Sequence, residues 1–304
     1  MMDAAAVAAA LPMPAAIDAV RTALAGGLDP AADPARAVVP VDHGQLLIMP
    51  AQWGDHAGVK VASVAPGNPA LGLPRIQGSY LLLDGPTLAP LAILDGIALT
   101  AIRTAAVSAV AADALAEPDA AHLVVFGSGP QARSHVTAFR AIRPVSRITV
   151  VGRDAGRTKE FAAWCDGRVG TAADVASADL VACCTTARTP LFDGTLLPRH
   201  ATVVAVGSHE PDAVEVDAAT VTAGTVVVEA RETALREAGD VVQPVAAGLL
   251  DTATLVELAA VVRGRAVPRD RPRLFKSVGM AWEDLVVAAA AYPAASNRSS
   301  VRTP

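Results

Sequence analysis

The spacing of hydrophobic residues along the chain changes near Pro118. Before it, apolar and polar residues alternate over strand-length segments at residues 37–50, 58–65 and 76–84, which are separated by turns rich in Gly, Pro, Asn and Asp. After it, short apolar strands, among them residues 180–184, alternate with helical patterns. Such alternation is typical of a parallel sheet with helices on both faces. The 304 residues therefore predict an α/β protein with two domains.

Helical periodicity predicts further segments. Residues 1–30 predict helix ending near Gly26-Gly27, and the alanine-rich residues 99–115 predict a long helix. The stretch 231–271 reads as helical and rich in loops, and a last helix near residues 280–291 is expected to return to the first domain. The predicted domains are residues 1–116 together with 280–304, and residues 117–279.

A glycine-rich turn opens the second domain. An apolar strand at residues 122–126 runs into Gly127-Ser128-Gly129, and a helical pattern follows, so that Gly127, Gly129 and Ala132 have G-x-G-x-x-A spacing. Gly127 allows the tight turn, Gly129 lets the backbone approach a pyrophosphate, and Ala132 lets the helix pack closely on the strand. The positive end of the helix dipole then faces the phosphates. The motif predicts a Rossmann-type doubly wound parallel sheet that binds a dinucleotide.

The end of the next strand bears on the choice of cofactor. An acidic residue there would bind the ribose of NAD, whereas an arginine suits the 2′-phosphate of NADP. The sequence reads Gly152-Arg153-Asp154, with Arg157 one helical turn later. We expect Asp154 to cap the following helix and Arg153 to bind the phosphate, which favours NADPH, with NADH as the alternative.

Composition excludes several classes of partner. The net charge is −5 and aromatic residues make up 3% of the chain, which argues against nucleic acid. We find no apolar run of the ~18 residues that a membrane span requires, and no Lys or Arg precedes Arg21, as an export signal would need. The three cysteines have no metal-binding spacing. The expectation is a cytoplasmic protein with neither a metal nor a membrane partner.

Several motifs, in this order, resemble the ornithine cyclodeaminase/mu-crystallin family. They comprise Arg36 before a strand ending at Met49-Pro50, Gly58-Val59-Lys60, residues 99–106 (LTAIRTAA), residues 127–132 (GSGPQA), Ala205-Val206-Gly207 and residues 276–280 (KSVGM). The resemblance covers most of the chain. It implies an NAD(P)-dependent enzyme and a homodimer. It also implies an N-terminal α/β domain for substrate and dimerisation, rejoined by the C-terminal helix.

The same resemblance assigns a basic cluster to the substrate carboxylate. The family's cluster maps onto Arg36, Lys60 and Arg103. A carboxylate suits the fork of an arginine, and Lys60 stands in an otherwise apolar strand. Arg75, where cyclodeaminases have a threonine, is either a further carboxylate ligand or a residue at the rim.

Cofactor contacts are expected from the glycine motif, from strand ends and from the resemblance. The residues assigned are Thr104, Gly127, Ser128, Gly129, Gln131, Ala132, Arg153, Thr185, Thr186, Gly207, Ser277, Val278 and Gly279.

Two departures from the cyclodeaminases indicate the reaction. His209 stands where they have a catalytic aspartate, and Leu47 where a glutamate meets the distal amine. A diamino acid would bring an ammonium into a pocket without these anions, at a cost of several kcal/mol. The resemblance therefore favours NAD(P)H-dependent reduction of a cyclic ketimine, Δ1-pyrroline-2-carboxylate or Δ1-piperideine-2-carboxylate, to L-proline or L-pipecolate.

The catalytic residues predicted for this reduction are His209, Lys60 and Ser208. His209, with Ser208, would hydrogen-bond the imine nitrogen or relay its proton, because histidine titrates near neutral pH. The alternatives are an ornithine cyclodeaminase, an amino-acid oxidoreductase of the alanine dehydrogenase type, an N-alkyl amino-acid synthase and a non-catalytic binder of NADPH and a small imino or amino acid.

Other polar residues are expected to be structural. Asp212, Glu215 and Asp217 predict a solvated acidic turn, and Lys276 reads as exposed. The histidines other than His209, which include His122 and His135, read as loop or surface residues.

Overall fold

The computed structural model describes residues 1–299, and within them side chains up to residue 292. It divides into two compact units, Met1–Thr104 with Met280–Pro304 (unit 1) and Ala105–Gly279 (unit 2). The first crossing between them falls inside helix α3 (Gly96–Leu115), because this helix continues without a break through Thr104. The second falls just before helix α10 (Ala281–Ser299).

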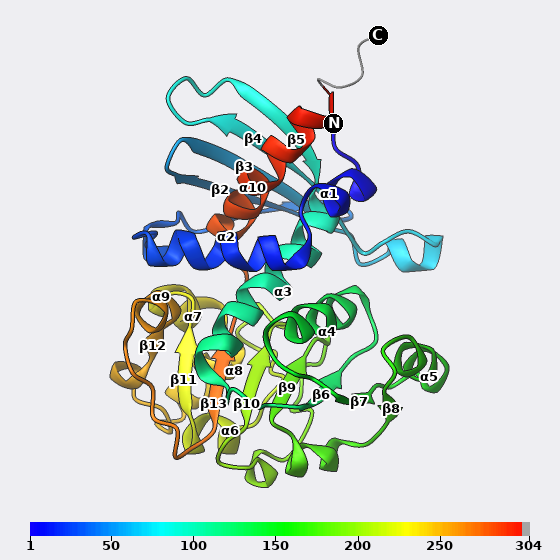
Figure 1. Ribbon diagram of the computed structural model, residues 1–304, viewed down its shortest axis with the longest axis vertical. Coiled ribbons are helices and arrows are strands. Elements are labelled where there is room, and N and C mark those ends of the chain that lie inside the picture. The colour runs from blue at the N-terminus through cyan, green and yellow to red at the C-terminus, as the bar shows by residue number, and fades with distance from the viewer. Residues whose placement is uncertain (300–304) are drawn as a thin grey trace. The chain divides into compact units, whose positions relative to one another are not determined.

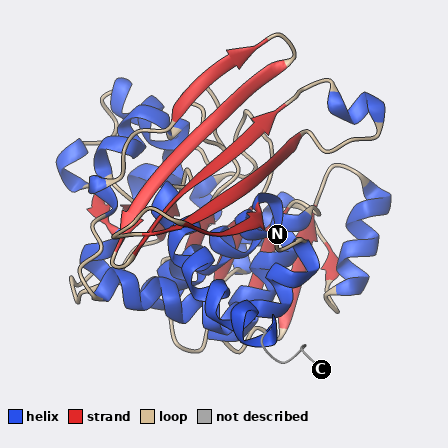
Figure 2. Ribbon diagram, turned by 90° about the horizontal axis from the view of Figure 1, so that it is seen from above, coloured by secondary structure: helices blue, strands red, loops and turns tan. Residues whose placement is uncertain are grey.

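Unit 1 is an antiparallel sheet of five strands in chain order (Figures 1 and 2). Helix α10 packs on β2, β3 and β4 and on helix α2, and it therefore covers one face of the sheet. The strands and helices are β1 (Ala37–Val41), β2 (Gly44–Trp53), β3 (His56–Val64), β4 (Ile76–Asp84), β5 (Pro90–Asp95), α1 (Ala4–Ala10) and α2 (Met13–Ala25).

The two faces of this sheet differ in exposure. Met49, Lys60, Tyr80 and Leu94 lie directly opposite one another across four strands, and all four are buried. Because side chains alternate along a strand, the neighbouring residues point to the other face. There Val61 is 42% and Ile93 45% exposed. The sheet therefore has one face inside the unit and one apolar face that is exposed among the described residues.

Unit 2 is a parallel sheet of eight strands in the order β12-β11-β13-β10-β9-β6-β7-β8 (Figure 1). The strands are β6 (His122–Phe126), β7 (Arg147–Val151), β8 (Arg168–Val169), β9 (Leu180–Cys183), β10 (Thr202–Ala205), β11 (Thr225–Val228), β12 (Val256–Glu257) and β13 (Arg273–Lys276). The helices are α4 (Pro130–Ile142), α5 (Ala155–Trp164), α6 (Ala218–Ala223), α7 (Arg231–Glu237), α8 (Gly239–Ala246) and α9 (Leu258–Val262).

The order of the strands reverses between β6 and β9. From β6 the chain builds outward to β7 and β8, then returns to add β9 and β10 on the other side. In open α/β sheets, ligands bind at such a switch point, beyond the carboxyl ends of the strands. The prediction of a doubly wound Rossmann-type sheet is confirmed, and the fold places the loops after β6 and β9 at its binding edge.

Strand β13 was not evident from the sequence pattern. It pairs with β10 on one side and β11 on the other, although residues 231–271, which contain helices, loops and the short strand β12, separate it from β11 in the sequence. Its four residues begin with Arg273 and end with Lys276, and both charged side chains are buried. Charged ends mask the apolar pattern by which a buried strand is recognised.

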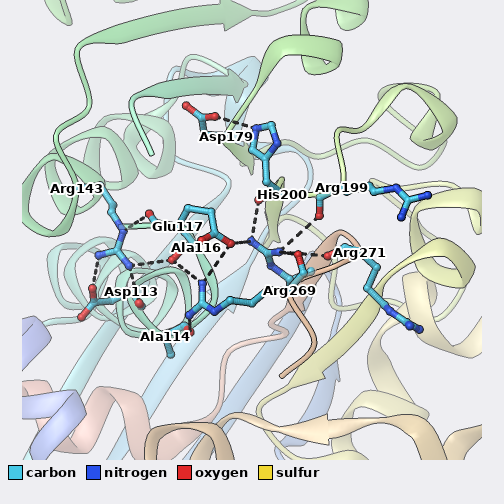
Figure 3. A network of polar contacts seen from close by, with 11 residues as sticks. Asp113, Ala114, Ala116, Glu117, Arg143, Asp179, Arg199, His200, Arg269 and Arg271 are labelled. Atoms are coloured by element: carbon cyan, nitrogen blue, oxygen red, sulfur yellow. Dashed lines mark hydrogen bonds and ion pairs between the residues drawn. The ribbon is translucent and has the colours of Figure 1, made fainter. Parts of the chain in front are cut away.

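The amino edge of the same sheet carries a polar network that includes Glu117, Arg269 and His200 (Figure 3). The guanidinium of Arg273 donates to the Glu117 carboxylate at 3.2 Å and to the His200 carbonyl at 2.7 Å. Arg269 contacts the same carboxylate at 3.3 Å, and His200 pairs with Asp179 at 2.9 Å. These residues precede β6, β9, β10 and β13 or begin β13, so this network ties the starts of four strands together.

Helix α3 bears on the expectation that no apolar run in the sequence is long enough for a membrane span. An 18-residue window of this helix has a mean hydropathy of 1.4, enough in length and composition for a membrane span, and helices α1 and α2 pass the same test as a bent pair. However, 61% of the α3 window is buried within the protein. A buried core helix satisfies the same criteria, and α3 has the burial of one.

Candidate active site

The glycine turn after β6 has the geometry that dinucleotide binding requires. Gly127 has φ +107°, and a Cβ there would lie 2.5 Å from the Cys184 carbonyl oxygen, so only glycine fits. At Gly129 a Cβ would meet nothing within 4 Å. Open space over this residue leaves room for a ligand against the backbone at the start of α4. The turn therefore fits a pyrophosphate.

A cavity of about 210 Å³ lies beside this turn and is lined by Ser128, Gly129, Pro130, Arg133, Arg157 and Glu160. Arg133 stacks over the Trp164 ring at 4.8 Å and lies 3.6 Å from the Glu160 carboxylate. Arg157 is in the first turn of α5, and its backbone N–H donates to Asp154 at 2.9 Å, which confirms Asp154 as the helix cap. Arg153 is exposed at the end of β7 and does not line the cavity.

Glu215 occupies the carboxyl edge of the sheet, between β9 and β10. One carboxylate oxygen accepts from the Thr185 N–H at 2.8 Å and its hydroxyl at 2.7 Å, and the other accepts from the Gly207 N–H at 2.6 Å. Burial raises the pKa of Glu215 to about 7. The expectation of a solvated acidic turn is wrong at Glu215, because this side chain is completely buried.

Lys276 is also buried rather than exposed, which corrects a second expectation. Its Nζ lies 2.8 Å from an Asp240 carboxylate oxygen and donates to the Ser208 carbonyl at 2.8 Å. The other Asp240 oxygen accepts from the backbone N–H groups of Glu215, at 2.7 Å, and Val216, at 2.9 Å. A buried ammonium and carboxylate are therefore tied into the same loops.

Glu229 binds residues 277–279, a segment that was predicted to contact the cofactor. Its carboxylate accepts from the Ser277 hydroxyl and the Val278 N–H, both at 2.8 Å, and from the Gly279 N–H at 3.2 Å. These three residues were predicted to contact the cofactor, and the structure commits these donors to Glu229. The segment is thus fixed in shape from within unit 2.

The predicted catalytic pair lies on the loop after β10. Ser208 is buried, and its hydroxyl donates to the Ala213 carbonyl at 2.9 Å. His209 follows and is half-buried. Of the residues predicted after β9, Thr185 is half-buried and Thr186 exposed. The structure brings Thr185, Gly207 and Ser208 together through Glu215 and Lys276.

In unit 1 the structure brings two predicted substrate-binding cations together. Lys60 Nζ lies 2.6 Å from Asp284 and 3.5 Å from the Thr100 hydroxyl. Arg103 pairs with Glu283 at 2.5 Å, and its Nε lies 3.6 Å from Asp284. Both carboxylates come from the first turn of α10. The sequence analysis did not predict these two carboxylates as partners of the cations. Two adjacent acidic residues before an apolar helical stretch could have indicated them.

The remaining residues assigned to substrate or cofactor differ in burial. Arg36 is half-buried ahead of β1, whereas Arg75 is exposed immediately before β4. Thr104 is buried on α3, Ala132 is buried on α4, and Gln131 is half-buried in the first turn of α4.

Burial alters the protonation of the unit 1 cluster. It lowers the pKa of Lys60 to about 8 despite the adjacent Asp284. It raises the pKa of Asp33 to about 7, assisted by the negative charges of Glu283 and Asp284. Asp33 accepts from the Trp282 N–H at 2.6 Å and so connects the loop before β1 to the start of α10. The Tyr80 hydroxyl is buried without a hydrogen-bond partner among the described residues, and burial raises its pKa.

Two histidines expected at the surface are buried. His122 bonds the Ser177 carbonyl at 2.7 Å and the Thr149 hydroxyl at 3.0 Å. His135 contacts the Ser108 hydroxyl at 2.9 Å, and burial lowers the pKa of His135 to about 4, so it is neutral at physiological pH. Both hold secondary structure elements together. Among residues 1–299, no group of three or more His, Cys, Asp or Glu side chains is arranged to hold a metal ion.

The parallel sheet, the glycine turn with open space over Gly129, and the loops at the carboxyl edge define a dinucleotide-binding α/β protein of the Rossmann class. The chain belongs to the ornithine cyclodeaminase/mu-crystallin family, whose model matches residues 1–299.

Relatives are similar over most of their length. A Δ1-pyrroline-2-carboxylate reductase of Bacillus cereus is 35% identical over 282 residues, which cover 87% of this chain and 86% of that protein. The Δ1-pyrroline-2-carboxylate/Δ1-piperideine-2-carboxylate reductase of Azospirillum brasilense is 35% identical over 98% of this chain and 96% of its own. The structure of the Thermococcus litoralis Δ1-pyrroline-2-carboxylate reductase, in complex with NADH and L-proline, has a TM-score of 0.92 and 31% identity over 98% of both chains.

The pKa of Asp33 leads to a prediction for stability. The folded state retains the Asp33 proton up to about pH 7, whereas the unfolded chain releases it near the ordinary value of 3.8. The folded state therefore binds more protons between these values, and stability falls as pH rises through this window. Asp33→Asn removes the titration and keeps an oxygen for the Trp282 N–H. Between pH 5 and pH 8, the free energy of unfolding of the wild type should fall by about 2 kcal/mol more than that of the variant.

Urea unfolding at both pH values, followed by tryptophan fluorescence, measures this difference. Equal changes in the two proteins would show that Asp33 is ionised throughout.

Proposed function

We propose that this chain is an NAD(P)H-dependent imine reductase that converts Δ1-pyrroline-2-carboxylate or Δ1-piperideine-2-carboxylate to L-proline or L-pipecolate. The structural observation that carries the proposal is the buried pair of cations, Lys60 and Arg103, in one cluster of unit 1. Two cations can hold the planar carboxylate that both substrates share. The names of the relatives from Bacillus cereus and Azospirillum brasilense support the same reaction.

The reduction requires that the substrate be oriented against the nicotinamide and that its imine nitrogen be protonated. A bound reduced nicotinamide supplies the hydride. Lys60 and Arg103 orient the substrate carboxylate, and their ion pairs with Asp284 and Glu283 fix both side chains before the substrate arrives. His209, on the loop after β10, hydrogen-bonds the imine nitrogen or relays the proton that makes the C=N bond reactive. Histidine suits this role because its charge changes near neutral pH.

The environment of Leu47 disfavours a diamino acid as substrate. Leu47 packs with Ala62 and Val64 in a buried apolar cluster, at the position where cyclodeaminases hold a distal amine with glutamate. The carboxylates Glu283 and Asp284 are committed to Arg103 and Lys60. An ammonium placed beside Leu47 would lose its hydration without gaining a counter-ion.

For the dinucleotide, we propose NADPH, with NADH as the alternative. Arg153 follows β7, where a 2′-phosphate is recognised in this class of fold. Arg157 lines the cavity beside Ser128 and Gly129, and so adds a second cation to the same region. The relative from Thermococcus litoralis was solved with NADH, which keeps the alternative open.

We also propose a homodimer formed through the open face of the unit 1 sheet. Val61 and Ile93 are exposed there, next to the half-buried Ile48, Val59 and Leu81 on the paired strands. Contiguous exposed apolar residues on a sheet mark an interaction surface. A second copy of the same sheet would cover them.

The activity is tested by oxidation of NADPH or NADH with each cyclic ketimine. The wild type should turn over at least one of the two, and Lys60→Met should lower kcat/KM by about a hundredfold, because it removes the hydrogen-bonded cation beside Asp284 and a carboxylate ligand. The wild-type kcat/KM should fall above about pH 8, where Lys60 loses its proton.

Lys159→Met, on the exposed surface of α5, is the matched control and should retain activity. Turnover only with pyruvate and ammonia or an amine would instead indicate an amino-acid dehydrogenase or N-alkyl amino-acid synthase. Ammonia release from ornithine would indicate a cyclodeaminase, and tight binding of NADPH without turnover of any substrate a non-catalytic binder.

Cofactor preference is tested by titration of nicotinamide fluorescence. Arg153→Ala and Arg157→Ala should each weaken NADPH binding by about tenfold, or ~1.4 kcal/mol, and leave the Kd for NADH within about twofold. Arg199→Ala, which removes an exposed cation before β10, is the control. Equal loss of both dinucleotides would argue against a 2′-phosphate site at these residues.

The dimer is tested by light scattering of the purified protein. The wild type should have twice the mass of the chain, and Val61→Asp should shift it toward the monomer, because a charge on the apolar face opposes burial. Val169→Asp, at an exposed valine of unit 2, should leave the mass unchanged. A monomeric wild type would rule out the proposed dimer.

A further inference from the structure

One completely buried carboxylate links the loop after β9 to the loop after β10, and at the surface Arg188 links the same loops through Glu210 and Asp212. The two oxygens of Glu215 face different loops: one receives both donors of Thr185 and the other the N–H of Gly207. The side chain is completely buried, so water does not compete for these hydrogen bonds. The relative position of the two loops therefore depends on this side chain.

The packing at Gly207 shows how closely the loops approach. A Cβ at Gly207 would lie 1.9 Å from the Thr185 carbonyl oxygen and 2.4 Å from a Glu215 oxygen. No side chain fits there without displacing backbone. The contact leaves the loop after β10 little freedom to move past Thr185.

The ion pair of Lys276 and Asp240 closes a ring around this contact. Lys276 donates to the carbonyl of Ser208, the residue after Gly207, and Asp240 accepts from the N–H of Glu215 itself. The connections thus run from the Glu215 side chain through Gly207 and Ser208 to Lys276, then through Asp240 back to the Glu215 backbone. His209 is the next residue after Ser208 and lies outside the ring, so the position of its backbone depends on Ser208.

We propose that Glu215 is a positioning residue for the reduction: its carboxylate holds the loops after β9 and β10 in one arrangement, which the buried Lys276–Asp240 pair locks through the Ser208 carbonyl. The proposal rests on the proposed function, because the loop so held carries His209. Glu215 itself need not touch substrate or cofactor. Its effect is on where Thr185, Gly207 and His209 lie.

The arrangement is sensitive to the charge of Glu215. A proton on one of the two oxygens makes that oxygen a donor and a much weaker acceptor, so its hydrogen bonds to one of the loops weaken. The ionisable groups that face it are Lys276 on β13, Asp240 on α8, and the thiols of Cys183 and Cys184 at the end of β9. Burial raises the pKa of both thiols well above the ordinary value, so they stay neutral. With Glu215 titrating about pH 7, the loops should loosen as the pH falls below neutrality.

Glu215→Gln tests the proposal, because glutamine has the same size but only one accepting oxygen. Kd is measured with NADH, which lacks the 2′-phosphate that itself titrates near pH 6. The kcat and KM for the cyclic ketimine are measured in parallel. Glu232→Gln, which removes an exposed carboxylate of α7 outside both loops, is the matched control. Glu215→Asp keeps the charge but shortens the reach by one methylene.

The expected result is a fall in kcat/KM of about tenfold or more for both Glu215 variants, with a melting temperature close to that of the wild type. Wild-type affinity for NADH should weaken between pH 8 and pH 6, and this dependence should be absent in Glu215→Gln. The control should follow the wild type in every measurement.

Wild-type kinetics and an unchanged pH dependence of Kd in Glu215→Gln would overturn the positioning role. If Glu215→Gln does not fold, Glu215→Asp decides by the same kinetic criterion. A wild type that reduces neither ketimine would refute the proposed function alone. The NADH-binding comparison would then still decide whether Glu215 positions the loops.

Discussion

The structure depends on one constraint: a charge removed from water must meet an opposite charge or several hydrogen-bond donors within the protein. Lys276 meets Asp240 and a carbonyl, Glu215 meets two loops, and Lys60 meets Asp284. In each case the partner comes from another element, so the pairing that offsets desolvation also fixes one loop, strand or helix against another. Replacing either partner alone would cost more than the pair contributes.

The two edges of the unit 2 sheet use this constraint for different purposes. At the carboxyl edge, Glu215, Asp240 and Glu229 organise backbone that can meet a dinucleotide. At the amino edge, Arg273 is surrounded by backbone carbonyls and Glu117 and ties the strand starts together. The division follows from a parallel sheet, in which every strand ends on the same side.

Much of the fold could be predicted from local pattern. Alternating residues predicted the strands of unit 1, the G-x-G-x-x-A spacing predicted the turn at Gly127, and the position of Asp154 after the next strand predicted the helix cap. These features are decided within a few residues. The burial of Glu215 could not be predicted in the same way. Asp212 and Glu215 lie on one acidic turn, yet Asp212 is exposed and Glu215 buried, since burial depends on packing against β9 and β10.

The same limit applies to the candidate site. Lys60 stood out in an apolar strand, but its partner Asp284 lies 224 residues further along the chain, and no spacing rule links them. Lys276 was predicted to be exposed because lysine side chains are almost never fully buried unless they are paired. Its burial became evident only from the position of β13 between β10 and β11.

The origin of Glu283 and Asp284 in the last helix also bears on synthesis at the ribosome. Domains generally fold as the chain emerges, from the N-terminus onward. Unit 2 is continuous in sequence and can fold once residue 279 is free, whereas Lys60 and Arg103 must wait for α10 before their charges can be buried. Unit 1, although it is begun first, is therefore completed last.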